Sequence, residues 1–469
     1  MSLPMHPLKQ SANEPRPRLG RALAQWTAGL RYEDLPPAAV AQIKRLLLDT
    51  LAVAWAGTGA AGIEAVRALV LAQQGRPESA LWAFGDRLTA PQAAFVNGMT
   101  AAALDFDSVH DEATVHADIV VLPAALALAE RERLSGREFL AAYAAGDEIL
   151  VRLGLAVQRH PGWFYTSVLG VFAAAAAAGR ALRLDAAGIQ AAMGVALSRA
   201  AGTQQPLVER SETKRLQSAF AARDGVEAAL LAQAGVTAPE DIFGGQSGFE
   251  TLYAGLDDAT VLEGLGREYR FTSLTLKKYA SCFCNHAPIE AALTLVRRGG
   301  LRAEDVKDAS VRISPFMARL VGAPFAPAGN PQVSAQFSVQ YSIASVLARG
   351  RFSADDIHPD AVSDPAVRAL AQRVRVEIDA AQPGRFAPAT VTVHTRAGAE
   401  LVATATELPG TPSHPMTDAE LRDKAMTCFR SGARPMTACA AERLMATVEK
   451  VETLADMHDL WSTAQKGTS

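Results

Sequence analysis

The sequence predicts a mainly α-helical protein, with a large all-helical domain formed by both chain ends and a smaller α+β lid domain inserted between them. Three observations support this fold. Apolar residues recur at helical spacing through most of the first 270 residues. Strand-like alternation becomes frequent only after about Thr272, and helical patterns return from Thr417. We therefore predict a helical domain over residues 1–271 and 407–469 and a lid over residues 272–406.

The helices of the first domain are predicted from apolar periodicity and from start signals. Ser135 and Glu138 form a capping box that opens a long helix. The run from Thr166 to Leu184 contains six consecutive alanines and is apolar on almost every side, which is typical of a buried helix. Ala80 to Phe84 is the single strand-like run in this part. The predicted helices here cover residues 19–30, 36 onward, 135–157, 166–184, 185–201 and 214–234.

The lid is predicted from alternating apolar and polar residues. The turn Arg396-Ala397-Gly398 separates two such runs and predicts a hairpin. The predicted strands are Val306–Ile313, Val374–Ile378, Thr390–Thr395 and Leu401–Thr406. Helices are predicted over residues 287–296, 334–347 and 365–373, and in the returning helical part over residues 417–430 and 435–448.

Composition excludes several classes of partner. The 469 residues carry a formal net charge of −3, so there is no basic surplus for nucleic acid. No uninterrupted apolar run reaches the length that spans a membrane, and residues 1–18 are polar. Four cysteines lack a CxxC pair, which favours reduced thiols over a zinc site. We expect a soluble, cytoplasmic protein.

The segment from Ala101 to Asp118 interrupts the apolar pattern. It contains four Asp, one Glu and two His, and the apolar run resumes at Ile119. Pro123 is predicted to be the first residue of the next helix. A patternless connection of this length inside a compact domain is usually functional or disordered, and the apolar flanks argue against disorder. A solvated acidic loop is the simpler alternative.

The chemistry of this segment has two interpretations. Asp105 and Asp107, with His110, Asp111 and His116, could bind a metal ion, because carboxylates and imidazoles are metal ligands. However, no HExxH or HxxEH pattern fixes two ligands on one helix face. The favoured alternative is proton transfer without a metal, in which a carboxylate and an imidazole act as base and acid.

Two further clusters carry cationic or polar side chains. Lys214 and Arg215 begin a largely apolar helix, where a cation opposes the helix dipole unless an anion lies in front of it. A solvated pair is the alternative. Lys277, Tyr279 and His286 lie at the predicted junction of the domains, where clefts form, although each would also be an ordinary surface residue. No phosphate-binding glycine pattern is present, which argues against a nucleotide cofactor.

Taken together, these clusters resemble the MmgE/PrpD family, which includes 2-methylcitrate dehydratase, cis-aconitate decarboxylase and iminodisuccinate epimerase. The order and spacing of the motifs along nearly the whole chain carry the resemblance. The motifs are Leu48-Asp49-Thr50-Leu51-Ala52-Val53, Leu104-Asp105-Phe106-Asp107 with His116, Thr166-Ser167-Val168-Leu169-Gly170, Thr213-Lys214-Arg215-Leu216, Lys277-Lys278-Tyr279 through His286, and Gln336-Phe337-Ser338-Val339-Gln340-Tyr341.

The resemblance implies a homodimer with its active site between the two domains and with no metal or organic cofactor. By motif match, Asp105, His116, Lys214 and Lys277 fall at active-site positions. The two lysines would bind the carboxylates of a small di- or tricarboxylic acid, and Asp105 or His116 would move a proton at the carbon α to one of them. We also count Arg215, Tyr279 and His286 among the predicted substrate-binding residues.

One departure from the family affects the predicted reaction. Many relatives carry Gly-Phe-His-Pro where this chain reads Gly162-Trp163-Phe164-Tyr165, so Phe164 replaces an imidazole, and His160 lies too far upstream to be its direct equivalent. Tyr165 becomes a candidate acid, unless these aromatics simply narrow the pocket. We predict a lyase, either a dehydratase or a decarboxylase. An epimerase is the second hypothesis, and a non-catalytic carboxylate-binding dimer is the third.

Overall fold

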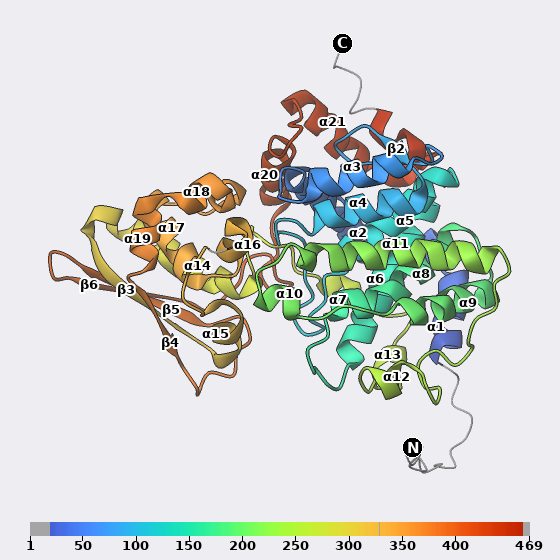
Figure 1. The fold of residues 1–469 in the computed structure, drawn as a ribbon, viewed down its shortest axis with the longest axis horizontal. Helices are drawn as coiled ribbons and strands as arrows, with labels where there is room; N and C mark the ends of the chain where they lie inside the picture. The colour runs from blue at the N-terminus through green and yellow to red at the C-terminus, as the bar shows by residue number, and fades with distance from the viewer. Residues whose placement is uncertain (1–18, 328, 463–469) are drawn as a thin grey trace.

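Helices make up most of the molecule, and the one large sheet is confined to one end (Figure 1). The computed structural model describes residues 19–327 and 329–462. The mainly α fold with a small sheet region is confirmed. The polar segment noted at residues 1–18 lies outside the described residues. No described helix has the length and apolar character needed to cross a membrane.

The helical part is built around α8, whose six alanines Ala173–Ala178 are fully buried, as the apolar pattern predicts. Helices α5, α6, α9 and α11 pack against it. A two-stranded antiparallel ribbon, Ser79–Ala80 (β1) with Arg87–Leu88 (β2), replaces the predicted strand-like run. The helices are α1 Leu19–Gly29, α2 Pro37–Gly57, α3 Ile63–Gln73, α4 Ala90–Ala101, α5 Asp118–Arg131, α6 Gly136–Ala156, α7 Tyr165–Val168, α8 Gly170–Ala181, α9 Ala186–Ala196, α10 Gln205–Val208, α11 Thr213–Gln233, α12 Phe249–Leu252 and α13 Asp258–Leu262.

Local signals place several helix ends correctly. The Ser135 hydroxyl accepts a hydrogen bond from the Glu138 amide, and α6 begins at Gly136 as predicted. The prediction that α5 begins at Pro123 is wrong, because the helix begins at Asp118. The four apolar residues 119–122 are all buried, so packing them as helix outweighs the one backbone hydrogen bond that Pro123 cannot donate.

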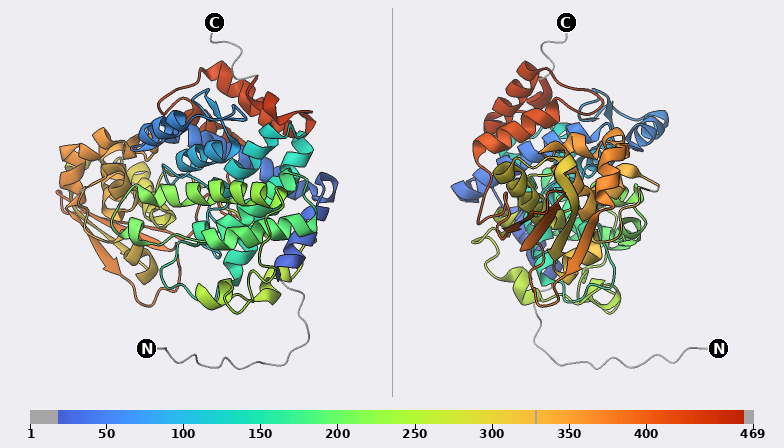
Figure 2. Two further views of the ribbon diagram at one scale, coloured as in Figure 1. Left: turned by 45° about the vertical axis from the view of Figure 1, so that its right-hand side comes forward. Right: turned by 90° about the vertical axis from the view of Figure 1, so that its left-hand side faces the viewer.

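The sheet has the strand order β4-β3-β5-β6 and contains the four predicted strands, with ends shifted by at most one residue. β3 pairs in parallel with β4 and antiparallel with β5, and β5–β6 is the predicted hairpin. Helix α14 packs on β5 and β6, and α17 packs on α14 and β4. In the right-hand view of Figure 2 this end faces the viewer. The bounds are β3 Val306–Ile313, β4 Val374–Ile378, β5 Ala389–Thr395, β6 Glu400–Ala405, α14 His286–Gly299, α15 Pro315–Val321, α16 Pro331–Gln336, α17 Val339–Arg349, α18 Pro359–Ser363 and α19 Pro365–Ala371.

Two predicted helices are each broken in two. The run 166–184 divides into α7 and α8, and the run 334–347 divides into α16 and α17. In the second case Ser338 leaves the helical conformation and its hydroxyl accepts a hydrogen bond from the Tyr341 amide, which starts a new helix. Apolar periodicity continues across such a cap and therefore does not reveal it.

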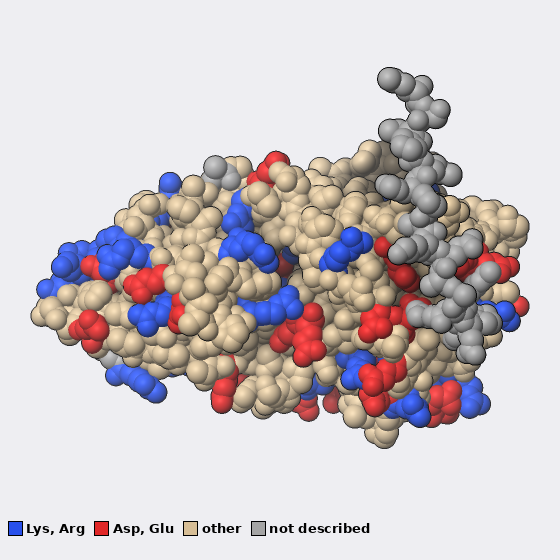
Figure 3. Space-filling model, turned by 90° about the horizontal axis from the view of Figure 1, so that it is seen from below, with Lys and Arg blue, Asp and Glu red and all other residues tan. Residues whose placement is uncertain are grey.

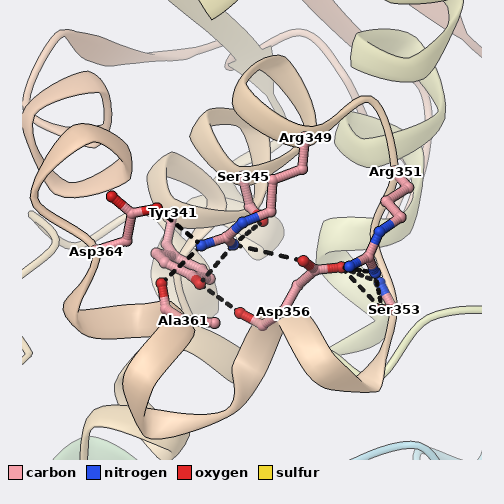
Figure 4. Close-up of polar contacts among 8 residues, drawn as sticks. All are labelled: Tyr341, Ser345, Arg349, Arg351, Ser353, Asp356, Ala361 and Asp364. Carbon is pink, nitrogen blue, oxygen red and sulfur yellow. Dashed lines mark hydrogen bonds and ion pairs between the residues drawn. The ribbon is translucent and has the colours of Figure 1, made fainter.

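A polar network holds α17 against the segment that follows it (Figure 4). The Arg349 guanidinium donates to the Ser345 hydroxyl at 2.9 Å and to the Ala361 carbonyl at 2.9 Å. Asp356 receives the Ser353 amide at 2.7 Å and forms an ion pair with Arg351 at 3.0 Å. These contacts join α17, which packs on β4, to the segment that follows it in the chain.

The chain returns to the helical part at its end. Helix α20 (Asp418–Phe429) packs on α2, and α21 (Ala438–Glu449) packs on both. The Lys424 ammonium of α20 donates to the carbonyls of Phe106 at 3.0 Å and Lys277 at 2.8 Å. Both chain ends thus contribute to the helical part, while the domain limits at residues 272 and 406 stay predictions.

Candidate active site

The connection between α4 and α5 is folded into the interior. Asp105 and Asp107 are only 3% and 1% exposed, so the alternative of a solvated acidic loop does not hold. Asp105 adopts a left-handed backbone with φ of 51°, a conformation that Asp tolerates better than most residues. Burying carboxylates is costly unless each is paired.

Two lysines from distant segments pair with Asp105. Lys214, in the first turn of α11, forms an ion pair with Oδ1. Lys277 Nζ lies 3.3 Å from Oδ2 and donates a 2.8 Å hydrogen bond to the Asp105 carbonyl. A pair of backbone hydrogen bonds between Val109 and Thr275 holds the Lys277 segment against the loop.

These ion pairs determine the charge states. Burial alone would raise the pKa of Asp105, but the ammonium groups of Lys214 and Lys277 outweigh it and lower that pKa far below its usual value. Burial likewise opposes the charge of Lys277, yet Asp105 and Asp107 raise its pKa above the usual value. The site therefore holds one carboxylate between two ammonium groups.

His116 forms the second pair of the site. Its Nδ1 lies 2.7 Å from Asp107 Oδ2, and its backbone amide donates to the Thr166 hydroxyl at 3.1 Å. Burial would raise the pKa of Asp107, but His116 and then Lys277 outweigh it and lower the pKa. With Nδ1 directed at a carboxylate, Nε2 is the ring nitrogen available to a substrate.

A cavity of about 400 Å³ collects these side chains between the helical part and the sheet-bearing part. Asp105, His116, Lys214, Lys277 and Tyr165, which are the catalytic candidates named from the sequence, all line it. Lys and Arg side chains gather near the middle of the face shown in Figure 3, where the two parts meet. The remaining lining residues are Val109, Thr114, His160, Trp163, Phe164, Gln204, Leu207, Cys282, Phe283, Phe316, Arg319, Leu320, Phe337, Arg385 and Phe386.

Three predicted substrate-binding residues lie outside this lining. The buried Arg215 guanidinium donates to the Ala61 carbonyl at 3.3 Å and to Gln332 Oε1 at 3.4 Å. Consecutive helical residues point about 100° apart, so Arg215 cannot follow Lys214 into the cavity. The Tyr279 hydroxyl donates to Glu290. His286 is fully buried against aromatic rings, and burial lowers its pKa to about 3.

Sequence reasoning missed or set aside other residues of the cavity. His160 lines it as Phe164 does, although it lies four positions upstream in sequence, and its ring contacts that of Tyr165. Arg319 of α15 and Arg385, in the connection between β4 and β5, also line it. Neither arginine belongs to a motif, so the only available signal was that each lies in the predicted lid.

The structure also shows the exposure of the cysteines and the arrangement of side chains that could bind a metal ion. Cys282, Cys284 and Cys428 are buried thiols and Cys439 is an exposed one. Within residues 19–327 and 329–462, no group of three or more His, Cys, Asp or Glu side chains is arranged to hold a metal ion.

The chain belongs to the MmgE/PrpD family. The MmgE/PrpD N-terminal domain matches residues 21–261, and the C-terminal domain matches residues 279–452. The chain is 30% identical to a cis-aconitate decarboxylase-like protein of Aspergillus oryzae, over 93% of this chain and 95% of that protein. It is 28% identical to mouse cis-aconitate decarboxylase (91% and 89% covered) and 27% identical to the human enzyme (94% and 93%). These relatives support an enzyme of the lyase class.

Proposed function

We propose that the protein is a lyase that acts on a small polycarboxylate, with decarboxylation of a cis-aconitate-like acid as its first candidate reaction. The observation that carries the proposal is the convergence of Asp105, Lys214, Lys277 and His116 on one cavity. The protein would use these side chains alone, without a metal or organic cofactor. The curated relatives favour decarboxylation over dehydration.

The two lysines would supply the electrostatic part of the reaction. When a bond breaks at the carbon α to a carboxylate, its electron pair spreads into that carboxylate and leaves it with additional negative charge. Lys214 and Lys277 are already fixed by Asp105, so their charges need no reorganisation when that charge develops. Asp105 would position the lysines, because its Oδ1 pairs with Lys214 and its Oδ2 with Lys277.

His116 would move the proton. Asp107 fixes the ring through Nδ1, as a second carboxylate commonly orients a catalytic imidazole. In a decarboxylation, the departing carboxylate would leave as carbon dioxide, and protonated Nε2 would deliver a proton to the resulting carbanion. Nε2 would reach a substrate that the two lysines bind, because His116, Lys214 and Lys277 line the same cavity.

Epimerisation is the second candidate. Phe164 lines the cavity where many relatives have histidine, and a phenyl ring cannot transfer a proton. An imidazole and a tyrosine in one lining, His116 and Tyr165, would suit proton exchange on two faces of a dicarboxylate. The family resemblance underlies our proposal of a homodimer, which light scattering on the eluting peak of a sizing column would test. Composition and the cysteine pattern underlie our proposal of a cytoplasmic location.

The reactions can be separated in deuterated water. The enzyme is incubated with cis-aconitate, 2-methylcitrate and iminodisuccinate, and the products are followed by NMR. We expect loss of carbon dioxide from cis-aconitate with one solvent deuterium in the product. A new double bond in 2-methylcitrate would instead identify a dehydratase, and deuterium in iminodisuccinate with unchanged connectivity an epimerase. No turnover of any of the three acids would refute the proposed function.

A further inference from the structure

The wall of the cavity contributed by the sheet-bearing part carries two arginines. Arg319 of α15 and Arg385 share one aromatic support, the ring of Phe316. The Arg319 guanidinium carbon lies 5.3 Å from the centroid of this ring, and that of Arg385 lies 4.7 Å away. Both guanidinium carbons lie within cation–π distance of the same ring, which brings the two cations together on this wall.

Neither arginine forms a direct ion pair among the described residues, and Asp111 and Glu112 act on Arg385 only through longer-range electrostatics. The Arg319 guanidinium makes no hydrogen bond or ion pair within residues 19–327 and 329–462, and its contact is with the Phe316 ring. Arg385 donates to the Glu112 carbonyl at 3.2 Å and to the Thr114 hydroxyl at 2.7 Å, and both acceptors are uncharged. A guanidinium has five N–H groups, so Arg385 retains donors after these two contacts. Two cations therefore face the cavity without a bound carboxylate among the described side chains.

The lining of the cavity as a whole carries a net positive charge. The charged lining residues are four cations, Lys214, Lys277, Arg319 and Arg385, and one carboxylate, Asp105, which together give a net charge of +3. The lysines share Asp105, so their side of the cavity retains one positive charge. The arginine side retains two. His160 also lines the cavity, and burial, Arg385 and Arg319 lower its pKa, which favours its uncharged form.

We propose that Arg319 and Arg385 form a second anion-binding subsite, which receives a carboxylate that the lysine side does not bind. The subsite makes the enzyme selective for tricarboxylates over short dicarboxylates, since a trianion balances the charge of the lining. This inference rests on the proposed function, because it assigns an additional carboxylate of the same substrate. Guanidinium groups suit this role because they bind carboxylates through two parallel hydrogen bonds.

Binding of two unreactive acids to the full-length protein tests the subsite. Propane-1,2,3-tricarboxylate and succinate differ by one carboxymethyl arm, and isothermal titration calorimetry measures each Kd. We expect the unmodified protein to bind the tricarboxylate more tightly. Arg319→Gln should weaken tricarboxylate binding about tenfold, because a hydrogen-bonded charge is lost, and succinate binding less than twofold. Arg385→Lys should also weaken tricarboxylate binding selectively, since the charge remains without the planar fork.

Arg375→Gln is the matched control, because Arg375 lies on β4 and pairs with Asp308 at 3.1 Å outside the cavity. It should change neither Kd. If Arg319→Gln weakened the binding of both acids equally, the arginines would act only through their general electrostatic field, and that result would overturn the proposed subsite. So would an unchanged tricarboxylate Kd, or an unmodified protein that does not prefer the tricarboxylate. Because these are binding measurements, failure of the lyase proposal would appear separately, as absent turnover in the NMR assay.

Discussion

The Lys277 ammonium contacts Asp105 twice, through a 2.8 Å hydrogen bond to the backbone carbonyl and a 3.3 Å approach to the carboxylate. The first contact fixes the backbone of the loop, and the second fixes the charge of the side chain. A residue 172 positions away in sequence thereby positions the central carboxylate of the candidate site. The same lysine is fully buried, so its charge acts in a medium of low dielectric constant.

Replacing Lys277 should therefore lower turnover far more than it disturbs the packing of the loop against the Lys277 segment. We expect Lys277→Met to lower kcat by about 10²- to 10³-fold, the range seen when one fixed electrostatic donor is removed from an active site. Lys278→Met is the matched control, because the neighbouring ammonium pairs with Glu290 at 3.0 Å and does not line the cavity. Steady-state rates measure both. Similar losses in the two variants would contradict the role of Lys277.

The backbone of Asp105 gives a separate prediction for stability. Its φ of 51° is tolerated by Asn but strained for Ala, so Asp105→Asn should unfold at a higher urea concentration than Asp105→Ala. The expected difference in the free energy of unfolding is about 1 kcal/mol. Both variants lose the carboxylate charge, so the difference reports the backbone together with the side-chain contacts that Asn retains and Ala lacks. Equal stabilities would mean that this loop relaxes when the charge is removed.

The sequence indicated the helical wall of the site because its residues interrupt apolar runs. Asp105 and His116 stand out in an alanine-rich chain, and Lys214 opposes a helix dipole. The orientation of a side chain is harder to predict. Tyr279 was assigned to the substrate, but its hydroxyl donates to Glu290 on α14, a partner eleven positions away that no local pattern reveals.

The other wall could not be predicted from patterns. Arg385 lies in the connection between β4 and β5, and its position over the cavity depends on the parallel register of β4 with β3 and on contacts with Thr114. Arginine in a loop is ordinary in composition, so only the folded chain distinguishes it. The strands were predicted well for the opposite reason, since alternation along each one is a local signal.

Asp107 should affect catalysis indirectly, by orienting the His116 ring. Asp107→Asn removes the charge that favours the Nδ1–H form of the ring, so we expect kcat to fall by about 10²-fold or more while KM changes little. The split between kcat and KM provides the distinguishing readout, because a residue that orients the catalytic ring changes turnover rather than substrate binding. A change in KM alone would place Asp107 in substrate binding instead.

Tyr165 lines the cavity, yet its hydroxyl donates a 2.5 Å hydrogen bond to the Arg159 carbonyl. Burial also raises its pKa above 10. We therefore expect Tyr165→Phe to keep kcat within about threefold, because the ring still fills the wall and the proton is held elsewhere. Deuterium incorporation under the NMR assay checks this. A loss of 10²-fold or more, the size of a missing general acid, would restore Tyr165 as the proton donor.

Asp111 predicts how stability depends on pH. Burial raises its pKa to about 6, and the Thr275 hydroxyl donates to its Oδ1 at 3.2 Å. The pKa of Asp111 in the folded protein lies above the value of about 3.9 in the unfolded chain, so the folded protein binds this proton more tightly. Proton binding by Asp111 therefore stabilises the fold fully below about pH 4, and this stabilisation is lost as the pH rises through 6. Asp111→Asn keeps the acceptor but cannot ionise. Its stability relative to the unmodified protein should therefore increase by roughly 2 kcal/mol between pH 4.5 and 7.5, measured by urea unfolding. A difference that does not vary with pH would mean that Asp111 titrates in the folded protein as it does in the unfolded chain.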